Sequence, residues 1–212
     1  MERPRSSVAR RRLLKGAAAL PAVLLAGSAG PAFAGRVEAQ QRPDADWVPA
    51  APGNYTVANR PRQYPVDFVV IHVTQETYAD TLGIFQNPAK KVSAHYVVRS
   101  ADGRVAQCVR EADVAWHAGN WDYNTRSVGI EHEGWVDKPE YFTDAMYSAS
   151  AALTAAICDS YAVPKTRAHI IGHHEVPGAT HTDPGPGQVW LQCSTVGLDA
   201  TTDLAHRAAG HG

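Results

Sequence analysis

Residues 66–73 have the sequence VDFVVIHV, and this stretch indicates the class of fold. Its central run, from Phe68 to Ile71, is aromatic and β-branched, with no polar residue in alternation. Strands with one face in water alternate apolar and polar residues, so an unbroken apolar run is typical of a strand covered on both faces. We therefore predict a buried strand over residues 66–73, with His72 near its C-terminal end.

The sequence around this strand interleaves further strand patterns with helix patterns. Residues 143–162 have the apolar spacing of an amphipathic helix, and Thr77 is a suitable N-cap for a shorter helix ending near Phe85. We expect further strands over residues 94–98, 104–109, 114–117 and 128–133 and in the apolar run up to Gly172, with a polar loop over residues 118–126. Residues 101–103, Ala-Asp-Gly, indicate a hairpin between the first two of these strands. The pattern predicts an α/β fold with a mixed central β-sheet flanked by helices.

The N-terminal residues have the composition of an export signal. Residues 1–34 contain the basic run Arg10-Arg11-Arg12, an Ala/Leu-rich stretch and the A-x-A cleavage sequence Ala32-Phe33-Ala34. This order is typical of a twin-arginine-type signal peptide, and the apolar stretch is too short and too alanine-rich for a good membrane span. We therefore expect an exported protein that is not stably inserted in a membrane after cleavage.

The remaining chain divides into three parts by composition. Residues 35–65 are rich in Pro, Arg and Gln, which predicts an extended N-terminal arm that can pack in part through Trp47 and Tyr55. The folded domain is assigned to residues 66–195, and residues 196–212 form a C-terminal tail.

The charge of the chain excludes one class of partner. Six of the 20 Lys and Arg residues and one of the 21 acidic residues lie in residues 1–34, so the rest carries 14 basic and 20 acidic residues. Its net charge is therefore near −6 with His neutral, and no cluster of basic residues survives. Nucleic acid and anionic lipid both require such a cluster, so neither is an expected partner. We expect a monomer.

Cysteine usage leaves the disulfide question open. Three cysteines in an exported chain, Cys108, Cys158 and Cys193, allow at most one internal disulfide. Cys158 and Cys193 could meet across the core, whereas Cys108 has apolar neighbours and is expected to be a small buried hydrophobe. A C-x-x-C zinc pattern is absent.

Reactive side chains follow the ends of several predicted strands. His72 and Glu131 end two of them, and residues 168–187, AHIIGHHEVPGATHTDPGPG, place His173 after a third. A loop broken by Pro and Gly then carries His181 and Asp183. Sites in helix-covered sheets lie beyond strand ends, and two imidazoles with one carboxylate make an open zinc site. The alternative is a polar surface loop.

Other residues near these positions compete for or lack a role. Glu133 lies two residues beyond Glu131 and should face the same side of the strand, so it is the competing carboxylate. His174 follows His173 directly and is expected to point away. The remaining histidines of the predicted domain are expected to pack or to support other groups: His95, His132 and His169.

Five segments together resemble a known family. The segments FVVIHVT, SAHYVVRSADGRV, VAWHAGNW, NTRSVGIEHEG and IIGHHEVPGATHTDPGP are similar, in order and spacing, to type-2 zinc-dependent N-acetylmuramoyl-L-alanine amidases, which share a fold with peptidoglycan recognition proteins. The resemblance covers about residues 66–186. It implies that His72, His173 and Asp183 bind Zn²⁺, that Glu131 and His181 are the catalytic pair, and that three residues line the substrate groove: His117, Asn120 and Trp121.

The resemblance also implies a function. It predicts a secreted hydrolase of the cell wall that cleaves the amide bond between N-acetylmuramic acid and L-alanine of peptidoglycan. The alternative is a non-catalytic module of the same fold that binds peptidoglycan, and the full set of three ligands favours the enzyme. Members of the family often have Lys where this chain has His181, and the catalytic Tyr of phage-type members falls at Ala94. Glu131 is therefore expected to be the main acid–base group.

Overall fold

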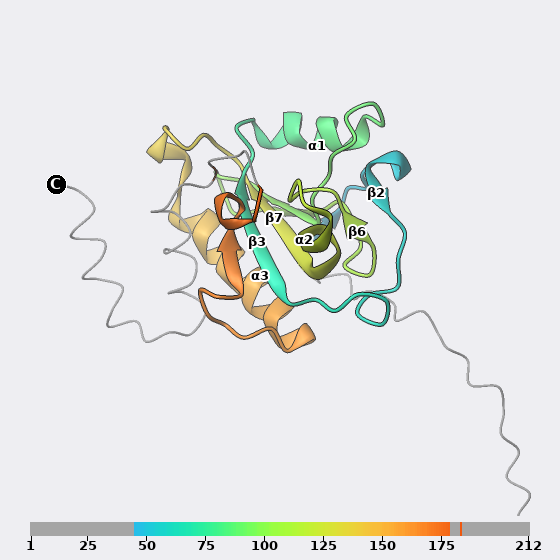
Figure 1. Ribbon diagram of the computed structural model, residues 1–212. Helices are drawn as coiled ribbons and strands as arrows, with labels where there is room; N and C mark the ends of the chain where they lie inside the picture. The colour runs from blue at the N-terminus through green and yellow to red at the C-terminus, as the bar shows by residue number, and fades with distance from the viewer. Residues whose placement is uncertain (1–44, 179–182, 184–212) are drawn as a thin grey trace, which may run out of the picture. The chain divides into compact units, whose positions relative to one another are not determined.

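Six strands form one mixed sheet in the computed structural model, which describes residues 45–178 and residue 183 (Figure 1). The strand order is β1-β5-β4-β7-β3-β8, and a two-stranded sheet pairs β2 with β6. Neighbours among β4, β7, β3 and β8 are parallel, whereas β4 and β5 form the predicted antiparallel hairpin. The predicted α/β class with a mixed central sheet is therefore confirmed. Residues 1–34, residues 196–212, His181 and Cys193 lie outside the described residues.

The elements follow one another along the chain with short connections. The strands are β1 (Ala45–Trp47), β2 (Tyr55–Thr56), β3 (Phe68–Val73), β4 (Tyr96–Val98), β5 (Val105–Gln107), β6 (Val114–Ala115), β7 (Ser127–His132) and β8 (Ile170–Gly172). The α-helices are α1 (Tyr78–Gln86), α2 (Trp121–Arg126) and α3 (Asp144–Tyr161), and three 3₁₀ turns are η1 (Pro52–Asn54), η2 (Pro139–Tyr141) and η3 (His173–Glu175). Among the described residues, no helix is both long and apolar enough to cross a membrane.

Side chains of β3 alternate between two helical layers. Val69 and Ile71 pack into the core cluster that includes Met146 of α3, whereas Val70 belongs to a smaller cluster with Ala118. Figure 1 shows α3 behind the sheet and α2 in front of it. Because successive residues of a strand face opposite sides, His72 shares the α2 side with Val70. Helices on both faces explain why β3 lacks polar alternation.

Neighbouring β7 has the same two-sided arrangement. Val128 and Ile130 lie in the cluster with α3, so Gly129 and Glu131 face the α2 side. The parallel register places Glu131 beside His72. The two strands therefore bring a carboxylate and an imidazole to one face at the C-terminal edge of the sheet.

Helix α2 replaces the polar loop that we expected over residues 118–126. The Asn120 side chain caps this helix, because its Oδ1 accepts a hydrogen bond from the Tyr123 N–H at 3.3 Å. A helix of six residues is too short to show a repeating apolar pattern, which is why the periodicity did not reveal it. The capping predicted for α1 is present, with Thr77 Oγ1 accepting from the Asp80 N–H.

Part of the segment expected to be an extended arm belongs to the folded domain. From residue 45 onward it contributes β1 to the edge of the main sheet and β2 to the small sheet. Arg60 is 1% exposed, and its guanidinium donates to the carbonyls of Glu111, Thr125 and Ser127 at 2.9, 3.1 and 2.7 Å. An extended, proline-rich composition is compatible with edge strands, so composition did not distinguish an arm from this packed segment.

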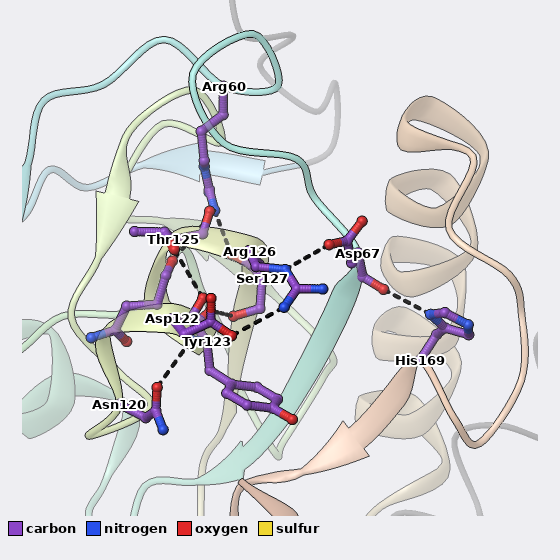
Figure 2. Close-up of polar contacts among 10 residues, drawn as sticks. Arg60, Asp67, Asn120, Asp122, Tyr123, Thr125, Arg126, Ser127 and His169 are labelled. Carbon is purple, nitrogen blue, oxygen red and sulfur yellow. Dashed lines mark hydrogen bonds and ion pairs between the residues drawn. The ribbon is translucent and has the colours of Figure 1, made fainter. Parts of the chain in front are cut away.

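A polar cluster joins the starts of the parallel strands (Figure 2). Arg126 donates from Nε to Asp67 Oδ2 at 2.7 Å and from Nη1 to Asp122 Oδ2 at 3.0 Å. The His169 ring donates from Nδ1 to the Asp67 carbonyl at 3.0 Å. These contacts link the residues that precede β3, β7 and β8. We call the four residues at the start of the strands the start-end cluster: Asp67, Asp122, Arg126 and His169.

Candidate metal centre

Three side chains converge beyond the C-terminal ends of β3 and β8. His72 is the penultimate residue of β3, His173 follows β8 directly, and Asp183 reaches the same place from the following loop. One ligand atom from each lies within 4.8 Å of the others, and all three residues are buried. Asp183 Oδ2 is 3.6 Å from His72 Nδ1, and its Oδ1 is 3.2 Å from His173 Nδ1. Parallel strands end at one edge, which explains how residues about 100 positions apart meet here.

The three side chains offer a donor set suited to a metal ion. The Asp183 carboxylate turns a different oxygen to each histidine, Oδ1 to His173 Nδ1 and Oδ2 to His72 Nδ1. Two imidazole nitrogens and one carboxylate are a donor set that zinc accepts, with a fourth position left for water or substrate. His72, His173 and Asp183 could therefore hold a metal ion.

Asp183 is anchored and ionised in this position. Its Oδ2 accepts a hydrogen bond from the Val73 N–H at 3.3 Å, and its carbonyl accepts from the His174 N–H at 3.0 Å. Burial alone would raise the pKa of Asp183, but contacts with His173 and His72 outweigh burial and hold that pKa well below its usual range. The carboxylate therefore keeps its negative charge at neutral pH.

Beside the three ligands lies Glu131, a carboxylate that has no cationic partner among the described residues. Its Oε2 is shielded from solvent and makes no hydrogen bond to any residue in the described part of the chain. Burial, and then the negative charge of Asp183, raise the pKa of Glu131 to about 8. A divalent cation held by the three ligands would favour the ionised carboxylate and so oppose this shift. Glu131 thus has the placement expected of an acid–base group.

Glu133, the competing carboxylate, has a structural role. Its Oε1 accepts from the Tyr78 N–H at 3.0 Å, and its Oε2 accepts from the Ser100 N–H at 2.8 Å. Both oxygens are thereby engaged in holding the start of α1 and the turn after β4. Sequence alternation gave both glutamates the same face, and only their surroundings separate them.

His117 is buried and lies against His72. It is 7% exposed, with Nδ1 at 2.9 Å from His72 Nε2 and Nε2 at 3.2 Å from Ser127 Oγ. Burial, and then the neighbouring His72, lower the pKa of His117 well below its ordinary value, so the ring is neutral. The place of His117 in a substrate groove, expected from the family resemblance, stays a prediction. No local spacing rule joins residues 45 apart, and sequence reasoning missed this contact.

Asn120 and Trp121 remain at the surface near the candidate centre. Trp121 is 52% exposed, and Asn120 Nδ2 donates to the Pro177 carbonyl at 3.0 Å. This bond connects the start of α2 with the loop that follows His173. Their predicted contact with substrate stays a prediction.

His132 supports His72 from the opposite face of the sheet. Its Nδ1 lies 2.8 Å from the His72 carbonyl, and its Nε2 lies 2.7 Å from Ser150 Oγ in α3. Burial is the main cause that lowers the pKa of His132, to about 4, so its neutral ring donates to the carbonyl and accepts from the hydroxyl. This agrees with the supporting role expected from the sequence. His181, predicted to be catalytic, lies outside the described residues.

Comparison with known proteins identifies a family and individual proteins whose sequences are similar to this chain. The sequence profile of the family described as N-acetylmuramoyl-L-alanine amidase (Amidase_2) matches residues 62–186. N-acetylmuramoyl-L-alanine amidase A of Achromobacter lyticus is 42% identical over 115 residues, which are 54% of this chain and 62% of that protein. The 1,6-anhydro-N-acetylmuramyl-L-alanine amidase AmpD of Escherichia coli (strain K12) is 38% identical over 118 residues, 53% of this chain and 62% of AmpD. The matches thus span less than two thirds of each relative.

Solved structures show the same fold. The crystal structure of a selenomethionine AmpD derivative superposes with a TM-score of 0.60 and 27% identity, covering 75% of this chain and 97% of AmpD. The amidase AmiD from E. coli, solved with the substrate anhydro-N-acetylmuramic acid-L-Ala-D-gamma-Glu-L-Lys, superposes with a TM-score of 0.52 and 25% identity. That match covers 69% of this chain and 64% of the AmiD chain. The sheet with its flanking helices is therefore shared with these two proteins.

Proposed function

This chain belongs to the N-acetylmuramoyl-L-alanine amidase family, and from that premise we propose that it is a zinc hydrolase of peptidoglycan. The bond cleaved is the amide between N-acetylmuramic acid and L-alanine. The observation that carries the proposal is the meeting of three metal-ligand side chains with Glu131 on one face of the sheet. Relatives that match more than half of this chain are named for that amidase activity.

Each of the proposed site residues has a distinct role in amide hydrolysis. Zinc, when bound by His72, His173 and Asp183, polarises the scissile carbonyl and makes water more acidic. Glu131 takes a proton from the attacking water and delivers it to the leaving nitrogen, which is then expelled as an amine. His181, assigned from the sequence, donates to the developing oxyanion, a contribution of about 3–4 kcal/mol for one donor of this kind.

Muramyl peptides are the proposed substrates. The AmiD complex holds a ligand of that class, and its fold matches this chain. In this chain Trp121 is exposed at the start of α2, where Asn120 bonds to the loop that follows His173. We assign both residues to substrate binding, because an exposed aromatic ring suits contact with a substrate that combines a sugar with a short peptide.

A non-catalytic peptidoglycan-binding module is the competing function. Such a module needs neither a complete ligand set nor an acid–base carboxylate, and the enzyme is favoured because three residues that could hold a metal ion lie together with Glu131 nearby. The test is mass spectrometry of muropeptides after digestion of purified peptidoglycan, with and without a chelator. We expect free stem peptides that begin with L-alanine, lost on chelation and restored by added zinc. Intact muropeptides under zinc-replete conditions would refute the amidase.

Export is proposed on the sequence of residues 1–34. The basic run of residues 10–12, the Ala/Leu-rich stretch and the A-x-A sequence support a twin-arginine signal peptide and action in the cell wall. N-terminal sequencing of extracytoplasmic protein should give a first residue of Gly35. Replacing Arg11 and Arg12 together by lysine should leave the chain uncleaved in the cytoplasm. Unchanged cleavage in that variant would rule out the twin-arginine route.

A further inference from the structure

The imidazole of His72 has two different neighbours on its two ring nitrogens. Its Nδ1 faces Asp183 at 3.6 Å, on the side where the three ligand atoms converge. Its Nε2 lies 2.9 Å from His117 Nδ1, on the side of α2, and the two rings meet edge to face at 89°. One nitrogen can therefore bind a metal ion while the other bonds to His117.

A metal ion bound at His72 Nδ1 would determine which atom donates in each of the hydrogen bonds that run from His72 through His117 to Ser127. A neutral imidazole has one donor and one acceptor nitrogen, so His72 must then carry its hydrogen on Nε2 and donate it to His117 Nδ1. His117 in turn carries its hydrogen on Nε2, which lies 3.2 Å from Ser127 Oγ. The Ser127 hydroxyl donates onward to the Tyr123 carbonyl at 2.5 Å. Figure 2 shows Ser127 at this junction of α2 and β7.

The His117 ring has little room to move. A methyl group added at Gly129 would lie 2.6–2.8 Å from three atoms of that ring, so only glycine allows the ring to lie against β7. Asn124 Oδ1 accepts from the N–H groups of His117 and Ala118 at 3.0 and 2.8 Å. The ring is thus confined by the strand below it and by the helix beside it.

Ser127, the last side chain in this series, is itself held from a distant part of the chain. Its carbonyl accepts from Arg60 Nη1 at 2.7 Å, and Figure 2 shows Arg60 reaching this point from the N-terminal segment. Arg60 precedes the part of the chain that the family profile matches. A segment outside the family match therefore contributes to the support behind His72.

We propose that His117, supported by Ser127, is a positioning residue for the metal centre, which orients the His72 ring and selects the tautomer with a free Nδ1. Hydrogen bonds of this kind from ligand histidines raise metal affinity, and their loss commonly costs about 10- to 100-fold. The inference rests on the proposed function only in taking zinc as the metal. It concerns binding of the ion and not cleavage of the amide.

The test compares zinc affinities of the full-length protein, measured by competition with a chromophoric chelator. His117→Leu removes the acceptor while keeping an apolar side chain of similar bulk, and should weaken zinc binding about 10- to 100-fold. His117→Asn places an amide oxygen near the former Nδ1 and should recover most of that loss. His169→Leu is the matched control, because it removes an imidazole from the start-end cluster and should leave zinc affinity unchanged.

Two further measurements cover a variant that fails to fold. Ser127→Ala deletes only a hydroxyl and should give a smaller loss of affinity, about 3- to 10-fold, on the same reasoning. In the zinc-loaded wild-type protein, long-range ¹H–¹⁵N spectra should show His117 protonated at Nε2 and not at Nδ1. The opposite tautomer, or wild-type zinc affinity in His117→Leu, would overturn the assignment.

Failure of this inference is distinguishable from failure of the proposed function. Wild-type protein that binds zinc but leaves muropeptides intact would refute the amidase and leave the role of His117 standing. Amidase activity in wild type, together with unchanged zinc affinity in His117→Leu, would refute the role of His117 alone.

Discussion

The two ends of the parallel strands β3, β7 and β8 carry similar residue types in opposite electrostatic situations. At the start-end cluster the carboxylates of Asp67 and Asp122 both face the guanidinium of Arg126. At the C-terminal end Asp183 faces two imidazoles, and Glu131 forms no ion pair with any Lys or Arg of the described residues. The carboxylates at the start of the strands are thus paired with an arginine, whereas Glu131 at the C-terminal end has no Lys or Arg partner among the described residues, and that end could bind a cation.

Burial sharpens the contrast. The side chains of Arg126 and Asp67 are 36% and 33% exposed, whereas that of Asp183 is 10% exposed. Water screens the first pair, so its charges contribute little to stability, while the second group is held in a poorly solvated place. Acidic groups and imidazoles gathered in a buried place with perturbed pKa values indicate a functional site, whereas the same residue types paired at the surface do not.

The largest effect is expected from removing the carboxylate at the metal end. Asp183→Ala should abolish stoichiometric zinc binding, because the site then keeps only two protein ligands. Asp67→Ala is the matched change at the start-end cluster and should retain about one zinc per chain. Elemental analysis of both purified proteins measures this. Full zinc content in Asp183→Ala would break the comparison.

The thiol of Cys108 tests how far burial alone, without any proposed role in the metal centre, changes the reactivity of a side chain. Burial raises the pKa of the Cys108 thiol to about 12, from an ordinary value of 9.0. The difference of about three units makes its thiolate about a thousandfold scarcer near pH 8, so alkylation by iodoacetamide should slow by about that factor in the native protein. Peptide mapping by mass spectrometry gives the rate for Cys108.

The same shift sets the sign of a stability effect. Because the folded-state pKa of Cys108 lies above the unfolded one, the neutral thiol's contribution to stability is complete below pH 9 and is lost as pH rises toward 12.

Denatured protein is the control for the alkylation rate of Cys108. A native rate within tenfold of the denatured rate at pH 8 would show that Cys108 is accessible and that burial does not govern it.

Glu131 and Glu133, at the end of β7, test whether the carboxylate that lacks hydrogen-bond partners is the one that transfers protons. Glu131→Gln should keep zinc but lower turnover about a hundredfold or more, because it removes the proton carrier. Glu133→Gln should be milder in turnover and should lower stability by about 1–3 kcal/mol, since Gln cannot accept both backbone N–H bonds equally well. Kinetics on a soluble muropeptide and urea unfolding measure the two effects. The reverse ranking would contradict the assignment.

The smallest effect is expected at the start-end cluster. Arg126→Met keeps most of the side-chain volume and removes ion pairs that are half in solvent, so unfolding free energy should fall by less than about 1 kcal/mol. Zinc affinity should not change, because the cluster and the metal ligands lie at opposite ends of the strands. A loss of more than about 3 kcal/mol, or weaker zinc binding, would show that the two ends are coupled.

Sequence reasoning succeeded where local pattern and strand direction suffice. The apolar run before His72, the hairpin and the long helix α3 each have a periodicity or a turn that one segment contains by itself. Strand ends brought His72, Glu131 and His173 to one edge, the family resemblance singled out His72, His173 and Asp183 as the ligand set, and the structure places those three together. The roles of these residues in zinc binding and catalysis stay predictions.

Short elements and irregular segments were less accessible. Helix α2 is too short to show a period, although its cap, Asn120, is a recognisable signal. The segment from residue 45 pairs with strands and buries Arg60, which its composition alone did not reveal. In both places stability comes from contacts with distant parts of the chain rather than from propensity.

By itself, the sequence determined the α/β class, the order of the strands along the chain and the residues delivered to their C-terminal ends. Only the tertiary structure decided what each of those residues does beside its neighbours. It separated Glu131 from Glu133, brought His117 into hydrogen-bond contact with His72, and enclosed the His117 ring against Gly129. The physical reason is that alternation and spacing fix the face on which a side chain lies, whereas burial, hydrogen-bond partners and charge depend on residues far away in the sequence.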